Sequence, residues 1–309
     1  VSRVINQRGT VTDEVKVRVQ QAIDALQYIP NAGARALALQ RSGTLGAIIP
    51  TLNNALFAEG INAFECAARS LGYTFILTVS NADPSQQVQQ VMRMIERGVD
   101  GLLLVGNDHE PEVFTRLENT ATRHVCSWAF DALARAPNIG FDNAGAMHCV
   151  VDHLLELGHR QVGMLAGRSA TNDRARERIR GVVERLNYHG VALSPQRILE
   201  VDYSISASRK AFWELINHDV TAIICGSDVI AHGALLEALK MGLRLPEDLS
   251  ITGFDDLELS AELQPALTSV NVSAQDMGEQ AARALVAAVE NSSQVQSRQL
   301  ETHLVVRQT

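Results

Sequence analysis

A cysteine, an aspartate and a histidine within five residues form the strongest group of potential metal ligands in the sequence. Cys149, Asp152 and His153 stand at positions i, i+3 and i+4, so a helix would place all three side chains on one face, where zinc could bind. No further ligand pair accompanies them, and a free cysteine in an apolar stretch usually packs as a small core residue. We therefore expect a buried Cys149 with a polar edge, and neither a metal nor another cofactor.

The sequence motifs of common catalytic sites are absent. There is no G-x-S-x-G nucleophile elbow, no G-x-x-x-x-G-K-S/T phosphate loop, no G-x-G-x-x-G dinucleotide motif and no H-E-x-x-H zinc motif. We therefore expect a protein that is not an enzyme, and a turnover assay on a bound ligand would test this expectation.

An alternation of short apolar runs with longer amphipathic stretches predicts the elements that would position any site. The runs of strand length are TLGAIIP, YTFILTV, VDGLLLV, RHVCSW, QVGMLA, TAIIC and LSITGF. Between them, apolar residues recur at helical spacing, as at Phe57, Ile61, Phe64, Ala68 and Leu71. Strands that are apolar throughout and are separated by helices indicate parallel sheets covered on both faces.

These strand–helix units are too numerous for one small sheet. A chain of 309 residues with 46% hydrophobic content can bury a large core and usually forms about two domains. Several predicted helices end in a glycine, which suits the left-handed position past a helix end, in SLGYTFIL, ERGVDGLLL, ELGHRQVGML and KMGLRLPEDLSI. We predict an α/β protein with two doubly wound parallel-sheet subdomains, which bind ligands at the carboxyl ends of their strands.

The cysteines and the lack of long apolar segments indicate the compartment. The four cysteines show no C-x-x-C spacing, as expected for reduced thiols; they are Cys66, Cys126, Cys149 and Cys225. No apolar run is long enough to span a bilayer, and no export signal opens the chain. We expect a soluble cytoplasmic protein with no membrane partner.

Charge is distributed unevenly along the chain, whose net charge is −8. Residues 1–41 contain six basic and three acidic residues, and the rest of the chain contains 21 basic and 32 acidic residues. A small basic segment on a large acidic body is compatible with binding to nucleic acid, although short segments often differ this much by chance.

The basic segment contains a predicted helix. Thr12 suits the N-cap, Asp13 and Glu14 favour the positive helix end, and Tyr28 and Pro30 end the helix. The stripe expected to be buried consists of Val15, Val19, Ile23 and Leu26.

In this region the chain resembles the lactose-repressor (LacI/GalR) family of bacterial transcription regulators. VSRVIN, a helix ending in YIPN, and ARALALQRSGTLGAIIP are similar, in the same order, to that family's recognition-helix tail, third helix, hinge and first body strand. The resemblance continues through NNALFAEGINAFECAARSLGY, VDGLLL, IGFDNAGA, HLLELGHRQVGMLAG, SDVIAHGALLEALKMGLRLPEDLSITGFDD and LTSVNV. It covers the chain except for the first part of the helix-turn-helix.

The resemblance implies a fold like that of periplasmic binding proteins, preceded by a partial, all-α helix-turn-helix head. The expected domains are a DNA-binding part at 1–29, a hinge at 30–42 and an effector-binding and dimerisation domain at 43–309. Within the last domain we expect an N-subdomain of about 43–141 and 271–292 and a C-subdomain of about 142–270 and 293–309.

Contacts with double-stranded operator DNA are also implied. Arg3 matches a recognition-helix arginine that reaches a guanine edge or a phosphate, and Leu37 matches a hinge leucine that wedges into the minor groove. The alternatives are a solvated arginine and an ordinary linker leucine. Gly33 should make the hinge less stable without DNA. The expected DNA-binding residues are Ser2, Arg3, Asn6, Asn31 and Leu37.

The resemblance places a small-molecule effector between the two subdomains. Arg178 matches a clamping arginine, Asp255 an aspartate that accepts from ligand hydroxyls or amines, and Tyr203 an aromatic residue that stacks on the ligand. Phe57 would cover an apolar ring face, although a core role fits it equally well, and Arg178 could instead be a solvated helix charge. The expected effector-binding residues are Phe57, Trp128, Asp142, Arg178, Tyr203, Ser227 and Asp255.

Two departures from the family bear on the ligand. Where many sugar-binding members have an aspartate after the fourth strand, the chain has CSWAFD, with Trp128 near that point. GRSATNDRARER adds Arg168, Arg174 and Arg176 near Arg178. If some of these arginines turn inward, an anionic ligand such as a sugar acid would fit, and otherwise they form a solvated face.

These features together predict a DNA-binding transcriptional regulator, most simply a repressor, acting as a homodimer on a pseudo-palindromic operator. Effector binding would change the angle between the subdomains, which requires different effector affinities for the two arrangements. The alternative is a solute-binding receptor of the same fold, and the basic head and the lack of an export signal argue against it.

Overall fold

The computed structural model describes residues 4, 11–28, 33, 36, 41–81 and 83–309. The expected DNA-binding residues Ser2, Arg3, Asn6, Asn31 and Leu37 lie outside the described residues, as does most of the expected hinge.

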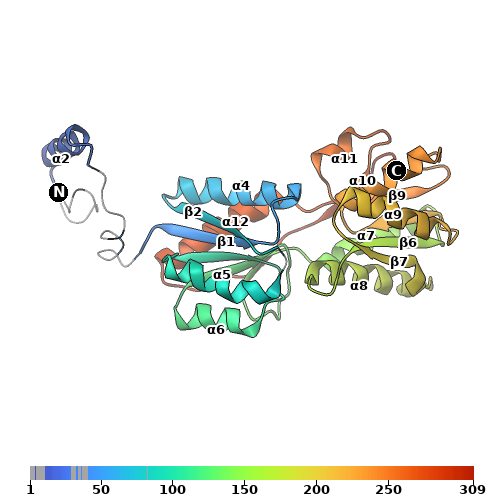
Figure 1. Ribbon diagram of the computed structural model, residues 1–309, viewed down its shortest axis with the longest axis horizontal. Helices are drawn as coiled ribbons and strands as arrows, with labels where there is room; N and C mark the ends of the chain where they lie inside the picture. The colour runs from blue at the N-terminus through green and yellow to red at the C-terminus, as the bar shows by residue number, and fades with distance from the viewer. Residues whose placement is uncertain (1–3, 5–10, 29–32, 34–35, 37–40, 82) are drawn as a thin grey trace.

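The predicted helix of the basic segment is present as α2 (Asp13–Ala25). Thr12 is its N-cap residue, as predicted, although the Thr12 side chain makes no capping hydrogen bond. The expected burial of its apolar stripe is wrong for the described residues, since none of α2 is buried and Val15 and Leu26 are exposed. The reason is that α2 lies apart from the two sheets and so has no described core to pack against (Figure 1).

The first lobe is built on a sheet in the order β11-β5-β4-β3-β1-β2, with every neighbouring pair parallel. Helices α4 and α12 pack together and cover one face, and α5 and α6 cover the other. The strands are β1 (Thr44–Ile49), β2 (Thr74–Val79), β3 (Gly101–Val105), β4 (Arg123–Ser127), β5 (Asn138–Gly140) and β11 (Arg298–Gln299). The helices are α4 (Ala55–Ser70), α5 (Pro84–Glu96), α6 (Pro111–Asn119) and α12 (Ala274–Glu290).

The second lobe repeats this plan on a sheet in the order β12-β10-β9-β8-β6-β7, in which only β12 is antiparallel to its neighbour. Helices α7 and α8 pack together on one face, and α9 and α10 on the other. The strands are β6 (Val162–Gly167), β7 (Ile198–Val201), β8 (Ala222–Cys225), β9 (Ser250–Asp255), β10 (Thr268–Asn271) and β12 (His303–Val305). The helices are α7 (Asn143–Glu156), α8 (Asp173–Tyr188), α9 (Ile205–Ile216), α10 (Asp228–Lys240) and α11 (Glu258–Glu262), with a 3₁₀ turn η1 (Pro195–Arg197).

The predicted fold class, two doubly wound parallel sheets, is confirmed, and so is the physical basis of the prediction. The central strands β3, β8 and β9 are buried along their whole length, because helices cover both faces of each sheet. The four glycines expected to end helices all have positive φ, between 73° and 93°, which side chains with a Cβ rarely adopt; they are Gly72, Gly98, Gly158 and Gly242.

Within the described residues the chain passes between the lobes three times, after β5, after β10 and after β11. Figure 1 shows these segments between the two lobes. The expected boundary at residue 293 is corrected by the pairing of Arg298 with Ile139 and of Gln299 with Gly140, which keeps β11 in the first lobe. The chain therefore returns to the second lobe only between 299 and 303.

No helix among the described residues is long and apolar enough to cross a membrane.

Candidate functional site

A cavity of about 550 Å³ lies between the lobes, at the carboxyl ends of strands from both sheets. Pro50 follows β1, Val105 ends β3 and Trp128 follows β4 in the first lobe, while Val201 ends β7 and Asp255 ends β9 in the second. This is the position at which doubly wound sheets bind ligands. Of the seven expected effector residues, five line this cavity: Phe57, Trp128, Arg178, Tyr203 and Asp255.

Two aromatic side chains form the apolar wall on the first lobe. Phe57, in the first turn of α4, meets Trp128 edge to face, with ring centroids 5.3 Å apart. Both residues are buried, and Gly60 admits the indole, because a Cβ at that position would lie 2.7 Å from Trp128 Cζ2. Trp128 has a φ of 65°, a conformation that is uncommon for a bulky residue. Its buried Nε1 has no hydrogen-bond partner among the described residues.

Asp255 provides the matching acceptor from the second lobe. Its side chain is only 2% exposed, its φ is 117°, and its Oδ1 has no hydrogen-bond partner. Arg178 Nη1 lies 3.8 Å from that oxygen. Burial, together with the nearby Asp228, raises the pKa of Asp255 to about 7 against the opposing effect of the Arg178 charge. A ligand hydroxyl or amine that donated to Oδ1 would therefore satisfy a buried carboxyl.

Arg178 is held rigidly on α8 rather than solvated. Its Nε donates to Asn143 Oδ1 over 2.9 Å, its Nη1 donates to the Gly226 carbonyl over 2.6 Å, and its guanidinium stacks 3.6 Å above the Phe254 ring. Burial lowers the pKa of Arg178, but an arginine still carries its charge. Asn143 in turn donates to the Trp128 carbonyl over 3.0 Å, which connects the arginine to the aromatic wall of the other lobe.

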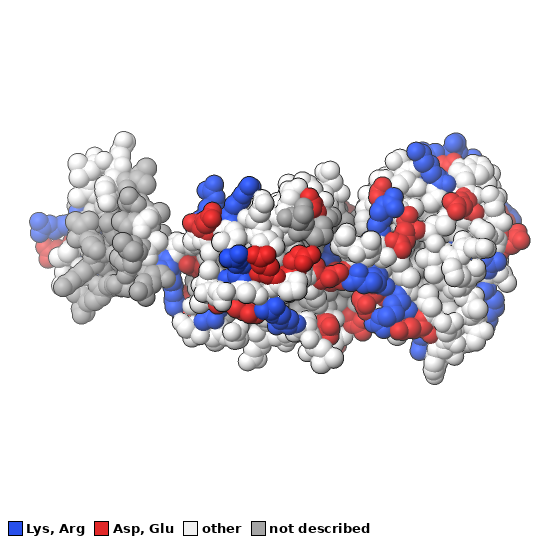
Figure 2. All heavy atoms as spheres, turned by 60° about the horizontal axis from the view of Figure 1, so that its bottom comes forward, with Lys and Arg blue, Asp and Glu red and all other residues white. Residues whose placement is uncertain are grey.

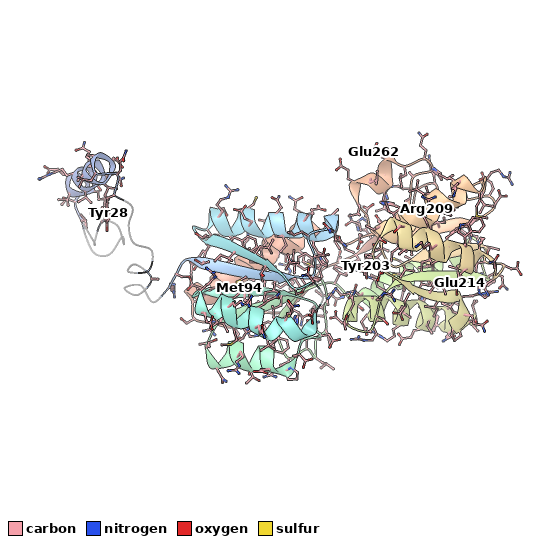
Figure 3. The ribbon with its side chains drawn as sticks, in the orientation of Figure 1. Tyr28, Met94, Tyr203, Arg209, Glu214 and Glu262 are labelled. Atoms are coloured by element: carbon pink, nitrogen blue, oxygen red, sulfur yellow. The ribbon has the colours of Figure 1, made fainter. Side chains whose placement is uncertain are left out.

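Tyr203 lies at the rim of the cavity, where Figure 3 shows it on the side of the second lobe that faces the first. Its hydroxyl accepts a hydrogen bond from Asn172 Nδ2 over 3.2 Å. Beside it, Arg168 Nε donates to Asp202 Oδ1 over 2.5 Å, and both of these side chains are about two-thirds exposed. The rim is therefore polar and open to solvent.

The arginines near the cavity do not create a positive surface. Each of the four lies within 4.0 Å of an aspartate: Arg168 near Asp202, Arg174 near Asp173, Arg176 near Asp108 and Arg178 near Asp255. Among the described residues that line the cavity are three arginines and five aspartates. Figure 2 shows basic and acidic side chains intermingled where the lobes meet. This arrangement does not favour an anionic ligand.

Direct contacts between the lobes close the cavity. The Asn107 backbone N–H, after β3, donates to Asp173 Oδ2 on α8 over 2.6 Å, and Arg176 Nη2 donates to Asp108 Oδ2 over 2.9 Å. At Gly106, whose φ is 81°, a Cβ would lie 2.0 Å from Arg174 Nη1, so only glycine permits this approach. We call this set of contacts the interlobe latch.

The partly buried residue His109 holds the first-lobe side of the latch. Its Nε2 lies 2.9 Å from the Gly106 carbonyl and its Nδ1 lies 2.6 Å from Gln87 Nε2. Burial lowers the pKa of His109, which favours a neutral ring that donates from Nε2 and accepts at Nδ1. Sequence reasoning missed this loop, and its only signal was its place after the apolar run VDGLLLV, at a strand's carboxyl end.

Two of the expected effector residues cap helices instead and do not line this cavity. Asp142 accepts from the backbone N–H groups of Ala144 and Gly145 at the start of α7, and it borders a separate opening of about 590 Å³. Ser227 is fully buried and accepts from Val229 N at the start of α10. Ser227 still affects the site, because its hydroxyl lowers the pKa of Asp255.

The Cys149 helix face is structural. The Cys149 thiol donates to the Ala146 carbonyl over 3.0 Å, and Asp152 accepts two hydrogen bonds of 2.7 Å from Arg185 and lies 3.0 Å from His189 Nε2. Among the described residues, no group of three histidine, cysteine, aspartate or glutamate side chains is arranged to hold a metal ion.

Comparisons with known families match both ends of the chain. Residues 1–31 match the family of bacterial regulatory proteins called the lacI family, and residues 151–309 match the periplasmic binding protein-like domain.

Individual proteins match over nearly the whole chain. The ribose operon repressor of Haemophilus influenzae is 30% identical over 95% of this chain and 89% of its own length. The HTH-type transcriptional repressor PurR of Klebsiella pneumoniae is 31% identical over 98% of this chain and 89% of its own length. The solved complex of the transcriptional regulator CelR with cellobiose superimposes with a TM-score of 0.76 at 27% identity, covering 99% of this chain and 94% of that one.

Proposed function

The chain belongs to the LacI family of bacterial regulatory proteins, and we propose that the cavity between its lobes binds the small-molecule effector that controls its affinity for operator DNA. The observation that carries this proposal is that two residues lining the cavity hold buried polar atoms without a hydrogen-bond partner, Trp128 Nε1 from the first lobe and Asp255 Oδ1, which has only the 3.8 Å ion pair with Arg178, from the second. Leaving such atoms without partners is costly, so a ligand that bridges them stabilises the closed arrangement of the lobes.

The effector we propose is a neutral or basic compound with one apolar ring face and several hydrogen-bonding groups. Phe57 and Trp128 would pack against the apolar ring face of the effector. Asp255 would accept a hydrogen bond from an effector hydroxyl or amine, and Arg178 and Tyr203 would hydrogen-bond to polar groups at the edge of the ring. The aspartates outnumber the arginines in the lining, which disfavours a sugar acid. Relatives are named for ribose or were solved with cellobiose, and these neutral sugars agree with this chemistry.

The same contacts explain how the effector would act. A ligand shifts an equilibrium only by binding one arrangement better than the other. The closed arrangement brings Trp128 and Asp255 to one ligand, and the interlobe latch adds Asn107–Asp173 and Asp108–Arg176 contacts to that arrangement. Effector binding therefore favours closure of the lobes and changes the angle between them. This change is passed to the amino-terminal segment.

We propose that this segment, with its DNA-binding part at 1–29 and a hinge at 30–42, binds a pseudo-palindromic operator as part of a homodimer, and that residues 43–309 form the effector-binding and dimerisation domain. In this proposal the protein is a cytoplasmic repressor that releases its effector chemically unchanged. Selection of duplexes from a random-sequence DNA library, with the protein carrying a complete helix-turn-helix, tests the DNA-binding role. Failure to enrich any duplex would favour a solute-binding receptor.

Melting temperatures test the effector site, because a ligand that binds the folded chain raises its melting temperature. Ribose, cellobiose, adenine, guanine and gluconate are the probes, and Asp255→Asn is compared with the wild type. Asp248→Asn is the matched control, since Asp248 pairs with Arg244 outside the cavity.

A neutral probe is expected to raise the melting temperature of the wild type and of Asp248→Asn by several degrees, and to have little effect on Asp255→Asn. A ligand that stabilised all three proteins equally would place the site elsewhere. Gluconate as the strongest ligand would contradict the proposed charge preference.

A further inference from the structure

The loop that follows β9 has an unusual backbone. Asp255 and Asp256 have φ values of 117° and 54°, so two consecutive residues other than glycine lie in the left-handed region. Such conformations persist only where the surroundings determine them strongly. The residues that hold this loop therefore decide where the Asp255 carboxyl points.

The backbone of the loop is held from within the second lobe. The N–H of Asp256 donates to Ser269 Oγ over 3.1 Å, and the N–H of Leu257 donates to Asp228 Oδ2 over 2.8 Å. Ser269 also donates to Asp228 Oδ1 over 2.5 Å, and Asp228 is completely buried. These bonds explain the backbone conformation but end inside one lobe.

The Asp256 side chain makes a different set of contacts. Its Oδ2 accepts from Asn271 Nδ2 over 2.9 Å, and its Oδ1 accepts from Arg307 Nη2 over 2.7 Å. The Asp256 and Arg307 side chains are only 11% and 18% exposed, so water screens this ion pair weakly. Both carboxylate oxygens of Asp256 are thus engaged.

One partner of Asp256, Asn271, lies where the chain leaves the second lobe, and the other, Arg307, is held within the second lobe, where its Nη1 donates to the Leu267 carbonyl over 2.8 Å. Asn271 is the last residue of β10, and its Oδ1 accepts from the N–H and the hydroxyl of Ser273, which caps α12 in the first lobe. Arg307 follows β12, the strand that begins directly after the third passage. Asp256 therefore connects the loop of the cavity to one of the three described passages, the one that follows β10.

We propose that Asp256 is a positioning residue that couples the Asp255 loop to the lobe angle through Asn271, while Arg307 holds the other carboxylate oxygen of Asp256 within the second lobe. This inference rests on the effector site proposed above. A ligand that pulled on Asp255 would move its neighbour, and the short polar contacts of Asp256 would pass that movement to the start of α12. A merely structural loop would need its backbone hydrogen bonds but not this link to Asn271.

An isosteric exchange isolates the Asp256–Asn271 contact. Asn271→Asp keeps the oxygen that accepts from Ser273 but replaces the amide donor with an oxygen that faces the Asp256 carboxylate. Adding Asp256→Asn restores a donor–acceptor pair in the opposite direction and leaves an oxygen for Arg307. Asn291→Asp, at the exposed end of α12, is the matched control.

The readout is the distance between spin labels in the two lobes, measured by pulsed electron paramagnetic resonance. Leu133 and Leu157 are 93% and 60% exposed, so cysteines at these positions accept labels, with Cys66 and Cys149 replaced by serine. Labelled chains are diluted with unlabelled ones, so that only distances within a chain are observed. Melting temperatures confirm that each variant is folded.

We expect one narrow distance distribution for the ligand-free wild type and for Asn291→Asp, a shifted or broadened one for Asn271→Asp, and recovery of the narrow one in the double variant. If Asn271→Asp did not fold, Asp256→Asn alone would carry the test. Asparagine tolerates the left-handed conformation at this position, and its amide NH₂ group would face that of Asn271, so the hydrogen bond between the two side chains would be lost. An unchanged distribution in a folded variant, or no recovery in the double variant, would overturn the proposal.

The ligand-free measurement is independent of the proposed function. Ribose, cellobiose and guanine are then added as probes, and a probe that shifts the distance in the wild type should bind Asn271→Asp while shifting it less. If the binding of no probe depended on Asp255, the proposed effector site would be wrong. The ligand-free distances would still test the role of Asp256. A full ligand-induced shift in Asn271→Asp would show that coupling does not pass through Asp256.

Discussion

At the level of single residues, the cavity is lined by residues with strained backbone and with buried polar atoms that make no hydrogen bond. Trp128 and Asp255 both have positive φ, and each carries a buried polar atom without a hydrogen-bond partner. Strained backbone and an unpaired buried polar group each cost about 1–3 kcal/mol. The chain retains both features on opposite walls of one cavity, which is the arrangement expected of a site that a ligand completes.

The titration of Asp255 gives a prediction with a definite sign. Burial raises the pKa of Asp255 from 3.8 to about 7. Above pH 7 the folded state holds an ionised buried carboxylate, which lowers stability, and this penalty disappears as the pH falls from 7 towards 4. Asp255→Asn should therefore raise the free energy of unfolding by about 4 kcal/mol at pH 8 and by less than about 1 kcal/mol at pH 4.

Urea unfolding of the variant and the wild type across this pH range measures the difference. Asp248→Asn should behave in the opposite way, because Arg244 holds the pKa of Asp248 below its usual value and the variant loses that interaction at neutral pH. An Asp255→Asn effect of equal size at pH 4 and pH 8 would contradict the raised pKa.

At the level of elements, the loop after β3 and the start of α8 decide whether the lobes close. Apolar periodicity predicted the strand and the helix, but the latch between them depends on residues with no periodic signal. Gly106 admits Arg174, the Asn107 backbone reaches Asp173, and Asp108 reaches Arg176.

Gly106→Ala should weaken the latch. Gly190→Ala is the matched control, since both glycines have positive φ but a Cβ at Gly190 would meet nothing within 4 Å. Both variants should lose about 1–2 kcal/mol of unfolding free energy from the backbone alone. Only Gly106→Ala should also increase the radius of gyration measured by small-angle X-ray scattering, because its Cβ would displace Arg174. Equal radii of gyration for the two variants would show that the close approach of Gly106 to Arg174 does not control closure of the lobes.

At the level of the whole molecule, regulation requires the amino-terminal segment and the two lobes to act together. Leu37 lies outside the described residues, and its assignment to the minor groove stays a prediction. In the protein with a complete helix-turn-helix, Leu37→Ala should weaken operator binding by about tenfold or more, while the melting-temperature shift caused by an effector stays nearly unchanged.

Operator binding of this variant is measured by fluorescence anisotropy at several salt concentrations, since contacts with phosphates make affinity fall steeply with salt. Leu39→Ala, two residues further along the same segment, is the control. Equal loss in both variants would indicate a general effect on the segment rather than a leucine wedge.

The parts of the fold that were predictable share one property, which is that their signal is local. Buried central strands appear as continuous apolar runs, and the glycines that end helices need positive φ wherever they occur. The short strands β5, β7 and β11 gave no such run, because they are short or lie towards a sheet edge, where polar residues are tolerated. β11 was therefore assigned to the wrong lobe.

By itself, the sequence determined the two doubly wound sheets, the strand ends that carry Trp128 and Asp255, and membership of the LacI family. Only the tertiary structure decided which charged groups face the cavity, because pairing joins residues distant in sequence, such as Asp108 with Arg176 and Arg178 with Asp255. Only the tertiary structure also showed that Asp142 and Ser227 cap helices and that Asp256 contacts Asn271, where the chain leaves the second lobe after β10. A sequence pattern reports which residues are available, whereas hydrogen bonds and ion pairs depend on distances that exist only after both lobes have folded.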